Sequence, residues 1–537
     1  MSIIKSPAPS VDIPDNVSLT EYLLRDFETY GDKVAVVDGI TERSYTFAQL
    51  KVLFRRCGSA LTRLGFKQHD VFAIYSPNLP EFPIVFFGVI GIGGTVTTVS
   101  PWYTTDELTR QLQQSGASYI ITVPMLVDKV KQAMDKCEKL KDIYVFGEAD
   151  GCTPFSSLLR DDGSAFPADV QVNPREDVAV LPYSSGTTGL PKGVMLTHYN
   201  LIANLEQMRS DALKLDAASD VLIGALPFFH IYGMVVILAV GLVQGVKIVC
   251  LPKFDPGLFL KCIQDHKVTR VHCVPPMALF LSQHPMVDTC DFSHVKELIC
   301  GAAPLGKGLS DAVMARLKHP TIRQGFGMTE ASPVTNLVRE DHVVPGSIGP
   351  LLPNTECKVV DIESGKLLGE GEDGELCVRG PQVMKGYLNN PEATANTIRD
   401  GWLHTGDIGH YDNEHNFYIV DRLKELIKYK CYQVPPAELE ALLLTHPGLQ
   451  DAAVVGVPDQ EAGELPKAYL VRKPGADVSA EQVMDYITGR VAPYKKLRLV
   501  EFTDRIPKSA SGKILRRFLK DKEAKKQENS IQYSSNE

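Results

Sequence analysis

The stretch Tyr183-Ser-Ser-Gly-Thr-Thr-Gly-Leu-Pro-Lys-Gly193 decides how this sequence is interpreted. The apolar run 178–182 before it and the run 194–198 after it both have the pattern of β-strands. Its three glycines allow the backbone between these strands to turn tightly and to approach a ligand closely. Lys192 adds one compact positive charge. We therefore predict a loop that binds a polyphosphate, and the alternative is a solvent-exposed turn.

The order of residues in this loop is Gly186-x-x-Gly189-x-x-Lys192, which differs from the GxxxxGK[ST] phosphate loop. The segment that follows is predicted to be a strand and not a helix, so a different kind of nucleotide fold is expected. Backbone amides and hydroxyl groups of the loop supply the hydrogen-bond donors. The residues that we expect to contact the nucleotide are Ser184, Ser185, Gly186, Thr187, Thr188, Gly189 and Lys192.

Length and composition indicate a globular protein with more than one folded unit. A chain of 537 residues exceeds what one hydrophobic core usually supports, and 44% hydrophobic with 23% charged residues is typical of a folded enzyme. The net charge of −9 argues against a nucleic-acid-binding surface. Eleven cysteines without a CxxC pair indicate reduced thiols. We expect a cytoplasmic protein, because neither a signal peptide nor a C-terminal Ser-Lys-Leu address is present.

Strand-like runs alternate with helical patterns through the first four hundred residues, which predicts an α/β fold. The expected strands are 71–75, 119–123, 178–182 and 246–250, and the expected helices are 105–115 and 256–266. Two uncharged segments, 82–105 and 221–246, are interrupted by Pro, Gly or polar residues, so we expect buried core and not membrane spans.

The pattern changes to short alternating strands at 356–419, which predicts a β-rich subdomain. A fresh α/β pattern follows Asp421-Arg422, with helices expected at 436–445 and 480–490 and a strand at 452–456. We therefore predict a large N-terminal domain of α/β layers, residues 1–421, and a small, mobile C-terminal α+β domain, residues 422–537. The charged segment 518–537 is expected to form a solvated helix.

Four further motifs carry chemical groups. They are Leu226-Pro-Phe-Phe-His-Ile-Tyr-Gly-Met234, Gly325-Phe-Gly-Met-Thr-Glu330, Trp402-Leu-His-Thr-Gly-Asp407 with Asp421-Arg422, and Ile506-Pro-Lys-Ser-Ala-Ser-Gly-Lys-Ile514. A neutral histidine ring can face a carboxyl group, and a carboxylate can accept ribose hydroxyls or hold Mg²⁺. Each motif alone has an ordinary structural interpretation as a core histidine, a helix start or a surface ion pair.

Taken together, these motifs resemble the adenylate-forming superfamily, which includes acyl-CoA synthetases, 4-coumarate:CoA ligases and beetle luciferases. The resemblance covers about residues 20–518 and is nearest to 4-coumarate:CoA ligase-like enzymes. It implies an ATP-dependent carboxylic acid:CoA ligase that uses Mg²⁺ and coenzyme A and forms an acyl adenylate. The acid is expected to be a hydroxycinnamate-like aromatic acid or a medium-chain fatty acid.

The resemblance also implies roles for single residues. It places Gly301, Ala302 and Ala303 beside the adenine, Asp407 and Arg422 at the ribose or phosphate, and Glu330 at Mg²⁺. It places Thr329 at the phosphates or the acyl carboxylate, and Lys513 between the attacking carboxylate and the α-phosphate. Lys428 and Gln433 are implied around the acyl phosphate and in thiolation, and Lys424 at a hinge spanning 422–428. The implied acid pocket consists of His230, Tyr232, Gly325, Pro333 and Val334.

The chain departs from the family pattern in the loop around residue 431. Cys431 stands where related ligases have glycine, and Pro435 stands where they have alanine. Because the family uses this loop to line the pantetheine tunnel, thioester formation is less strongly implied than adenylation. Two alternatives stay open: a luciferase-type monooxygenase and a catalytically silent nucleotide- or acyl-binding protein. Beetle luciferases have an arginine where this chain has Asn204, which disfavours the first alternative.

Overall fold

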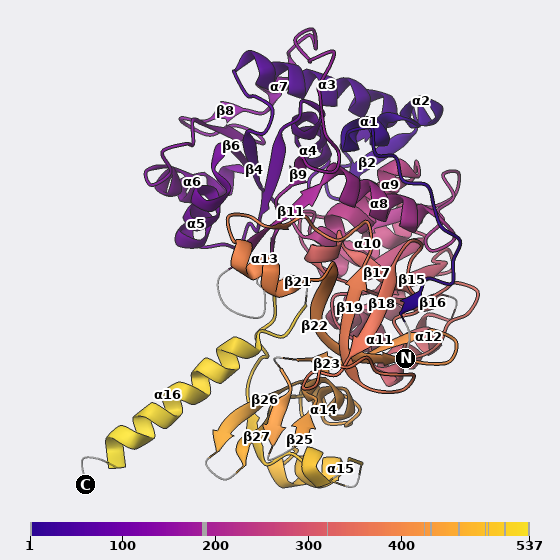
Figure 1. Ribbon diagram of the computed structural model, residues 1–537, viewed down its shortest axis with the longest axis vertical. Helices are drawn as coiled ribbons and strands as arrows, with labels where there is room; N and C mark the ends of the chain where they lie inside the picture. Colours follow the sequence, from indigo (N-terminus) through magenta and orange to yellow (C-terminus); the bar gives the residue numbers. More distant parts are fainter. Residues whose placement is uncertain are drawn as a thin grey trace.

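Four β-sheets organise the protein. The computed structural model describes residues 3–184, 191–318, 320–423, 425–429, 432–459, 462–488, 490–491, 493–509 and 512–534. Figure 1 shows the elements after β23 gathered at the bottom of the view, below the larger part of the chain. The structure therefore has the expected α/β class, with a large N-terminal and a small C-terminal domain.

The first sheet is mainly parallel at its centre and carries the predicted phosphate loop at its edge. Its strand order is β10-β11-β9-β5-β4-β6-β7-β8, with β20 beside β11. The strands are β4 (Val71–Tyr75), β5 (Thr95–Val99), β6 (Ala117–Thr122), β7 (Asp142–Val145), β8 (Thr153–Pro154), β9 (Val178–Val180), β10 (Tyr183–Ser184), β11 (Lys192–Thr197) and β20 (Gly386–Tyr387). The strand expected at 71–75 is confirmed, and the one expected at 178–182 is shorter.

The second sheet has the order β17-β16-β15-β14-β12-β13-β2-β3 and is parallel from β16 to β2. Its strands are β2 (Val34–Asp38), β3 (Ser44–Thr46), β12 (Val221–Gly224), β13 (Lys247–Cys250), β14 (Arg270–Cys273), β15 (Glu297–Cys300), β16 (Thr321–Gly327) and β17 (Val334–Leu337). One hydrophobic core extends through both parallel sheets. Parallel strands require covering layers on both faces, and most residues of these strands are accordingly buried.

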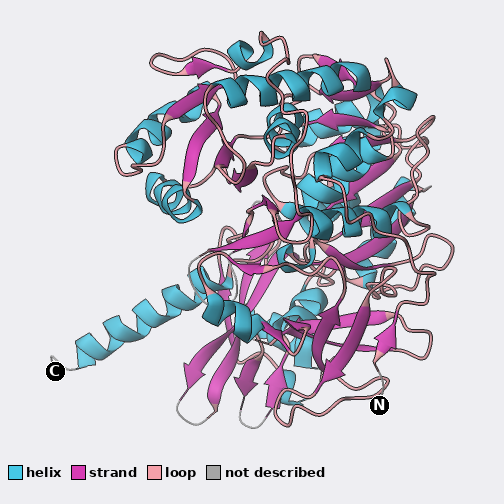
Figure 2. Ribbon diagram, turned by 45° about the horizontal axis from the view of Figure 1, so that its top comes forward, coloured by secondary structure: helices cyan, strands magenta, loops and turns pink. Residues whose placement is uncertain are grey.

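Helices supply those covering layers, and Figure 2 shows them gathered around the strands in the upper part of the view. They are α1 (Leu19–Leu24), α2 (Phe27–Tyr30), α3 (Phe47–Arg63), α4 (Phe82–Gly91), α5 (Thr105–Ser115), α6 (Val127–Met134), α7 (Ser156–Leu159), α8 (His198–Arg209), α9 (Val240–Val243), α10 (Pro256–Asp265), α11 (Pro275–Gln283), α12 (Lys307–Leu317) and α13 (Pro391–Thr397). Local signals set their ends. Helix α5 begins with a capping box between Thr104 and Glu107 and ends at Gly116 with φ +68°.

The two long uncharged segments form buried core, as expected. Helix α4 is buried along its first nine residues, and the ring of Phe82 lies 5.7 Å from that of Phe228. The segment 221–246 contains β12, the π-helical η2 (Tyr232–Ala239) and α9, which pack inside the same core. No helix in the described ranges is long and apolar enough to cross a membrane.

The expected β-rich region forms an antiparallel sheet, but the sheet is not built from that region alone. Its order is β1-β18-β19-β22-β21, with β23 beside β22. The strands are β1 (Ile4–Lys5), β18 (Glu356–Val360), β19 (Gly374–Arg379), β21 (Ile398–Arg399), β22 (Trp402–Tyr411) and β23 (Phe417–Arg422). The N-terminal strand β1 pairs with β18, whereas β20, from within the region, leaves to pair with β11.

The C-terminal sheet has a hydrophobic core of its own. It contains β24 (Ile427–Tyr429), β25 (Tyr432–Val434), β26 (Leu449–Asp459), β27 (Gly463–Arg472) and β28 (Leu499–Phe502), with helices α14 (Pro436–Leu443) and α15 (Ala480–Thr488). Helix α16 (Arg516–Ser534) extends away from the body of the molecule in Figure 1, but it is not solvated all round as expected, because Leu519 and Glu523 are buried against the C-terminal sheet.

A buried ion pair crosses the second sheet. Arg323 on β16 is 1% exposed, and its guanidinium binds both carboxylate oxygens of Glu297 on β15, at 2.6 and 3.1 Å. The same guanidinium donates to the carbonyl oxygens of Ala212 and Val338. Because three of these four contacts are buried and the fourth is partly buried, this arginine fixes the edge of the sheet from which β17 continues.

We expect Arg323→Met to lower the free energy of unfolding by about 3–5 kcal/mol, because it leaves a buried carboxylate and two carbonyl groups without this donor. The matched control is Arg339→Met, because Arg339 forms its ion pair with Asp341 at the surface. Arg339→Met is expected to lower the free energy of unfolding by less than about 1 kcal/mol. Urea unfolding followed by tryptophan fluorescence and circular dichroism measures both changes, and equal costs would contradict the prediction.

Candidate active site

Glu330 and the stem of the predicted phosphate loop lie together. Ser184 and Lys192 are partners across the β10–β11 pair, so the stem is a short antiparallel ladder. The Ser184 hydroxyl donates to Glu330 Oε1 at 2.8 Å, and the Tyr387 hydroxyl donates to the same oxygen at 2.9 Å. Lys192 Nζ lies 4.6 Å from the centre of the Tyr387 ring. The buried carboxylate of Glu330 and the ammonium group of Lys192 therefore both contact the side chain of Tyr387.

The other predicted loop residues, Ser185, Gly186, Thr187, Thr188 and Gly189, lie outside the described residues. The position of Glu330 has a clear local cause. It lies in the short turn η4 (Thr329–Ala331) between β16 and β17, where Met328 N donates to Pro333 O. A Cβ atom on Gly327 would lie 2.2 Å from Pro333 O, so only glycine permits this close turn.

His230 and Thr329 line a small cavity of about 50 Å³ beside this turn. Its wall also includes Tyr183 and Gln111. The Tyr183 hydroxyl and Gln111 Oε1 are buried and have no hydrogen-bond partner in the described part of the chain. Burial lowers the pKa of His230 to about 4, and the charge of Lys513 adds to this effect. His230 is therefore a neutral ring at physiological pH, next to polar groups that can accept a ligand.

Tyr232 and two of the predicted glycines form an adjoining wall. Tyr232 begins η2, and its hydroxyl donates to Ile299 O at 3.1 Å and lies 3.3 Å from His272 Nδ1. A Cβ atom on Gly301 would lie 3.0 Å from the Tyr232 ring and 3.5 Å from Gly325 O. The ring thus packs closely against backbone that has no side chain. Ala302 and Ala303 follow in the same loop, and Ala302 has φ +68°.

Pro333 and Val334 complete this wall through β17. Val334 pairs with Gly327 in the β16–β17 ladder. Asn204 on α8 is fully buried and binds both backbone groups of Val334: its Nδ2 donates to the carbonyl at 2.8 Å, and its Oδ1 accepts from the amide at 3.2 Å. Asn204 was considered above only in comparison with luciferases. In the structure it positions the strand that carries the predicted acid-pocket residues.

Asp407 and Arg422 form the next part of the site. They are opposite each other on β22 and β23, and Arg422 Nε lies 2.9 Å from Asp407 Oδ1. Asp407 is 2% exposed, and its Oδ2 has no hydrogen-bond partner among the residues that the structure describes. Burial raises the pKa of Asp407, and the charges of Arg422 and Lys513 oppose this effect. Arg422 thus binds Oδ1 of the buried carboxylate, and Oδ2 is the oxygen that a ligand can bind.

Lys513 reaches the same place from the C-terminal domain. Burial lowers the pKa of Lys513 to about 8, the charge of Arg422 contributes, and Asp407 opposes. The residue directly before Lys513 explains this position. Gly512 has φ +78°, and a Cβ atom there would lie 2.9 Å from Pro276 on α11, so the chain can approach the N-terminal domain only with glycine. Lys513 thus stands near both His230 and Asp407.

Not every predicted residue joins this cluster. Lys428 is exposed on β24, opposite Gln433 on β25, and its amide donates to Glu464 Oε2 at 2.8 Å. No hydrogen bond or ion pair within the described ranges links Lys428 to His230, Asp407 or Lys513. Only the backbone of Gln433 is described, and Lys424 and Cys431 lie outside the described residues.

Three residues of the site were not predicted. Tyr387 connects Glu330 to Lys192, Asn204 holds Val334, and His272 lies beside the Tyr232 hydroxyl. Tyr387 belongs to the short stretch Lys385-Gly-Tyr387, which is not part of any of the motifs described above. His272 stands in β14, where Arg270 is also polar, so the strand pattern does not single it out.

Comparison with known proteins places this geometry in a family. Residues 23–388 match the model of the AMP-binding enzyme family, and residues 438–513 match the model of the AMP-binding enzyme C-terminal domain. The chain is 43% identical over 526 residues to 4-coumarate–CoA ligase 1 of Solanum tuberosum, covering 96% of each chain.

Solved structures agree with the sequence comparisons. ATP-bound MatB from Rhodopseudomonas palustris superimposes with a TM-score of 0.85 at 29% identity, over 94% of this chain and 99% of that chain. The anthranilate CoA ligase AuaEII in complex with anthranoyl-AMP superimposes with a TM-score of 0.87 at 26% identity, over 95% and 98%. With its two matching domains and its lysine, aspartate and arginine cluster, this chain belongs to the AMP-binding enzyme family.

Proposed function

We propose that this chain is an ATP-dependent carboxylic acid:CoA ligase. The acid carboxylate attacks the α-phosphorus of ATP, pyrophosphate leaves, and an acyl adenylate forms. The CoA thiolate then attacks the acyl carbon, AMP leaves, and a thioester forms. One observation carries the proposal: Asp407 is buried with Oδ1 bound to Arg422, no residue that the structure describes binds Oδ2, and Lys513 lies beside this pair.

The nucleotide is bound by groups with separate tasks. Asp407 Oδ2 accepts a ribose hydroxyl, because an unpaired buried carboxylate oxygen gains most from a donor. Arg422, which is partly exposed, donates on the phosphate side of the ribose. The backbone of Gly301, Ala302 and Ala303 lies against the adenine ring, where small residues permit close stacking.

The β- and γ-phosphates are bound by the loop from Ser184 to Gly193, with Lys192 as its cation. Glu330 fits a hard cation such as Mg²⁺, because its two hydroxyl donors both reach Oε1 and neither occupies Oε2. Glu330 would hold Mg²⁺ there, and the ion would neutralise phosphate charge. Thr329, on the wall of the cavity shared with His230, contacts either the phosphates or the acid carboxylate.

Adenylation depends on positioning and electrostatics more than on a protein nucleophile. Lys513 donates to the oxygens that share negative charge as the carboxylate meets the α-phosphate. The neutral ring of His230 closes the cavity on the acid side without repelling this cation. The carboxylate of the acid therefore approaches the α-phosphorus between the ammonium group of Lys513 and the uncharged ring of His230.

The acid is proposed to be aromatic and hydroxycinnamate-like, and a medium-chain fatty acid is the second candidate. The Tyr232 ring and the glycines at 301 and 325 form a wall with few protruding side chains, against which an aromatic ring can pack, with Pro333 and Val334 on the β17 side. Relatives named 4-coumarate–CoA ligase and anthranilate CoA ligase support an aromatic acid.

Thioester formation is proposed to follow rotation of the C-terminal domain, residues 422–537, about a hinge at 422–428 that includes Lys424. The rotation replaces Lys513 at the site with the Lys428–Gln433 hairpin. Two observations support it: the C-terminal sheet has its own core, and the hairpin does not contact the cluster around Asp407 in the described part of the chain.

A pyrophosphate-release assay with ATP and a panel of acids tests the proposal. We expect turnover with hydroxycinnamates, slower turnover with medium-chain fatty acids, and thioester formation when CoA is added. Asp407→Asn is expected to raise the KM for ATP about 10- to 100-fold through loss of a buried charged hydrogen bond. Asp373→Asn, at an exposed ion pair with His410, serves as the control and should change nothing.

The outcomes separate the alternatives. Light emission or oxygen uptake after adenylation would favour a luciferase-type monooxygenase. Nucleotide binding without pyrophosphate release, for every acid in the panel, would favour a catalytically silent binding protein and contradict the ligase proposal.

The pH dependence of adenylation follows from Lys513. Its pKa is lowered to about 8, so the ammonium is present below this pH and is lost above it. We expect kcat/KM for ATP, measured by pyrophosphate release without CoA, to fall about tenfold per pH unit above pH 8. Lys513→Arg keeps the charge and should remove this alkaline limb, whereas Lys513→Ala should lower the rate about 10²–10³-fold. An alkaline limb that persists in the arginine variant would assign it to another group.

The second half-reaction is tested at residue 431. If Cys431 narrows the path of CoA, Cys431→Gly should accelerate thioester formation and leave pyrophosphate release unchanged, because only the thiol step uses this path. Cys152→Ser is the control for loss of a thiol elsewhere. Equal thioester rates in both variants and the unmodified enzyme would show that the departure from the family glycine has no effect.

A further inference from the structure

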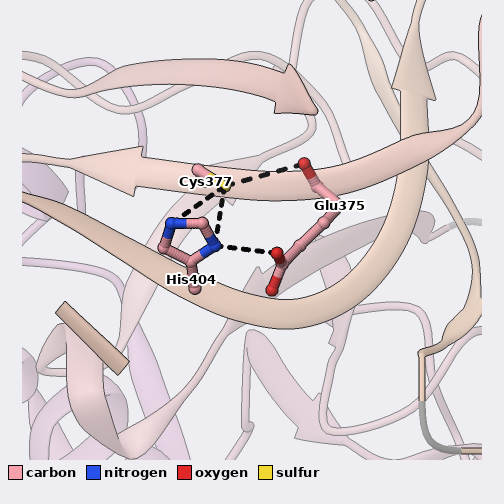
Figure 3. Close-up of side chains that lie close together, drawn as sticks. All are labelled: Glu375, Cys377 and His404. Atoms are coloured by element: carbon pink, nitrogen blue, oxygen red, sulfur yellow. Dashed lines mark hydrogen bonds and ion pairs between the residues drawn. The ribbon is translucent and has the colours of Figure 1, made fainter. Parts of the chain in front are cut away.

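Three potential metal ligands meet on the antiparallel sheet, outside the site described above. Cys377 on β19 and His404 on β22 are direct cross-strand partners. Glu375 lies two residues before Cys377, so its side chain points to the same face of the sheet. Figure 3 shows the three side chains converging, with dashed lines from the imidazole ring to both the sulfur atom and the carboxylate.

The distances between the ligand atoms are short. His404 Nδ1 lies 2.7 Å from Glu375 Oε2 and 3.4 Å from Cys377 Sγ. Among the described residues, this is the one group of three or more His, Cys, Asp or Glu side chains whose ligand atoms all lie within 4.8 Å of one another. Such a mixed nitrogen, sulfur and oxygen set suits Zn²⁺ and similar divalent transition metals.

Coordination through His404 Nδ1 requires the imidazole ring to turn, because Cys377 Sγ lies 3.4 Å from Nδ1 and 3.9 Å from Nε2 and therefore stands over the ring. With the usual zinc–ligand distances, sulfur and nitrogen ligands stand about 3.5 Å apart and nitrogen and oxygen ligands about 3.3 Å apart. The Sγ–Nδ1 separation already matches. The Nδ1–Oε2 separation has to widen by about 0.6 Å, which a small rotation of the Glu375 carboxylate achieves.

The carboxylate is oriented by a separate contact. Glu375 Oε1 accepts from Gly406 N at 3.1 Å, whereas Oε2 faces the histidine. One oxygen is therefore fixed by the backbone and the other is available as a ligand, which is the arrangement that supports metal ligands in proteins. Cys377 is fully buried, and the side chains of His404 and Glu375 are 13% and 11% exposed, so a water molecule can reach a fourth position.

We propose that Glu375, Cys377 and His404 form a binding site for a divalent transition metal of the Zn²⁺ class. The Cys377 thiol releases its proton to solvent as its sulfur binds the metal, and His404 binds through Nδ1 with its remaining proton on Nε2. A divalent ion with one thiolate, one carboxylate and one neutral imidazole has no net charge, which favours burial.

The simpler interpretation is a Glu375–His404 ion pair beside a packed cysteine. The two interpretations differ in what they require of the sulfur atom. An ion pair does not need Cys377, and Cys377→Ser would leave it intact. A metal site loses its soft ligand in the same variant.

A bound metal would act on the strand that carries Asp407. His404 precedes Asp407 by three residues on β22, and the Gly406 amide between them is bound by Glu375. Fixing both His404 and Glu375 to one ion holds this part of β22 against β19. Metal binding is therefore expected to raise the thermal unfolding midpoint of the full chain.

Cobalt titration tests the proposal on the full-length chain, without a polyhistidine tag or nucleotide and after treatment with a chelator. We expect one equivalent of Co²⁺ to produce a thiolate-to-cobalt charge-transfer band, and one equivalent of Zn²⁺ to remove it. The band should be absent in Cys377→Ser and unchanged in Cys152→Ser, which removes a thiol outside the cluster. Glu375→Gln keeps an acceptor for Gly406 and should weaken Co²⁺ binding at least about tenfold.

Absence of a stoichiometric band in the unmodified chain would overturn the proposal, and so would a band that survives in Cys377→Ser. If Cys377→Ser does not fold, as judged by circular dichroism, the decision rests on Glu375→Gln. Unchanged Co²⁺ affinity in that variant would equally overturn the proposal. Excess Mg²⁺ should neither produce the band nor displace Co²⁺, because a hard cation has little affinity for a thiolate.

Discussion

The pairing of Asp407 with Arg422 is the interaction on which the site depends. It joins the end of β22 to the end of β23, just before the chain enters the C-terminal domain. A buried carboxylate is unfavourable without a partner, and Arg422 satisfies only one of its two oxygens. The remaining oxygen, together with Lys513 from the other domain, creates a place where a hydroxyl-bearing, phosphorylated ligand is favoured over water. The geometry of one carboxylate therefore links ligand binding to the position of the C-terminal domain.

The two parallel sheets provide the rigid frame for the remaining groups. Their shared core fixes α8, and the fully buried Asn204 on that helix fixes the backbone of Val334. On the other side, β20 and β11 hold Tyr387 against Lys192 and Glu330. The acid wall and the phosphate side of the site are thus attached to different sheets, and the turn at Gly327 to Glu330 connects them. The glycine at 327 is required by the packing of this turn, since a Cβ atom there would collide with Pro333 O.

Sequence reasoning succeeded where the signal was local. Alternation of strand and helix patterns located β4 and α5 because hydrophobic periodicity and a capping box act over a few residues. The motifs also identified His230, Asp407, Arg422 and Lys513, which the structure brings together. In contrast, the pairing of β1 with β18 and of β20 with β11 joins residues hundreds of positions apart. No periodicity encodes such pairing, and the positioning roles of Asn204 and Tyr387 depend on it.

The electrostatics of Lys513 relate the chemistry to the proposed domain rotation. The shift of its pKa from the ordinary 10.5 to about 8 corresponds to roughly 3 kcal/mol against keeping an ammonium group in this place. Bound triphosphate offsets this cost because it brings negative charge next to the buried cation. After adenylation, pyrophosphate leaves and removes most of that charge, whereas the acyl adenylate retains a single phosphate. In the proposed rotation Lys513 would regain hydration by moving away, so we expect departure of the first product itself to favour opening of the C-terminal domain for the thiol.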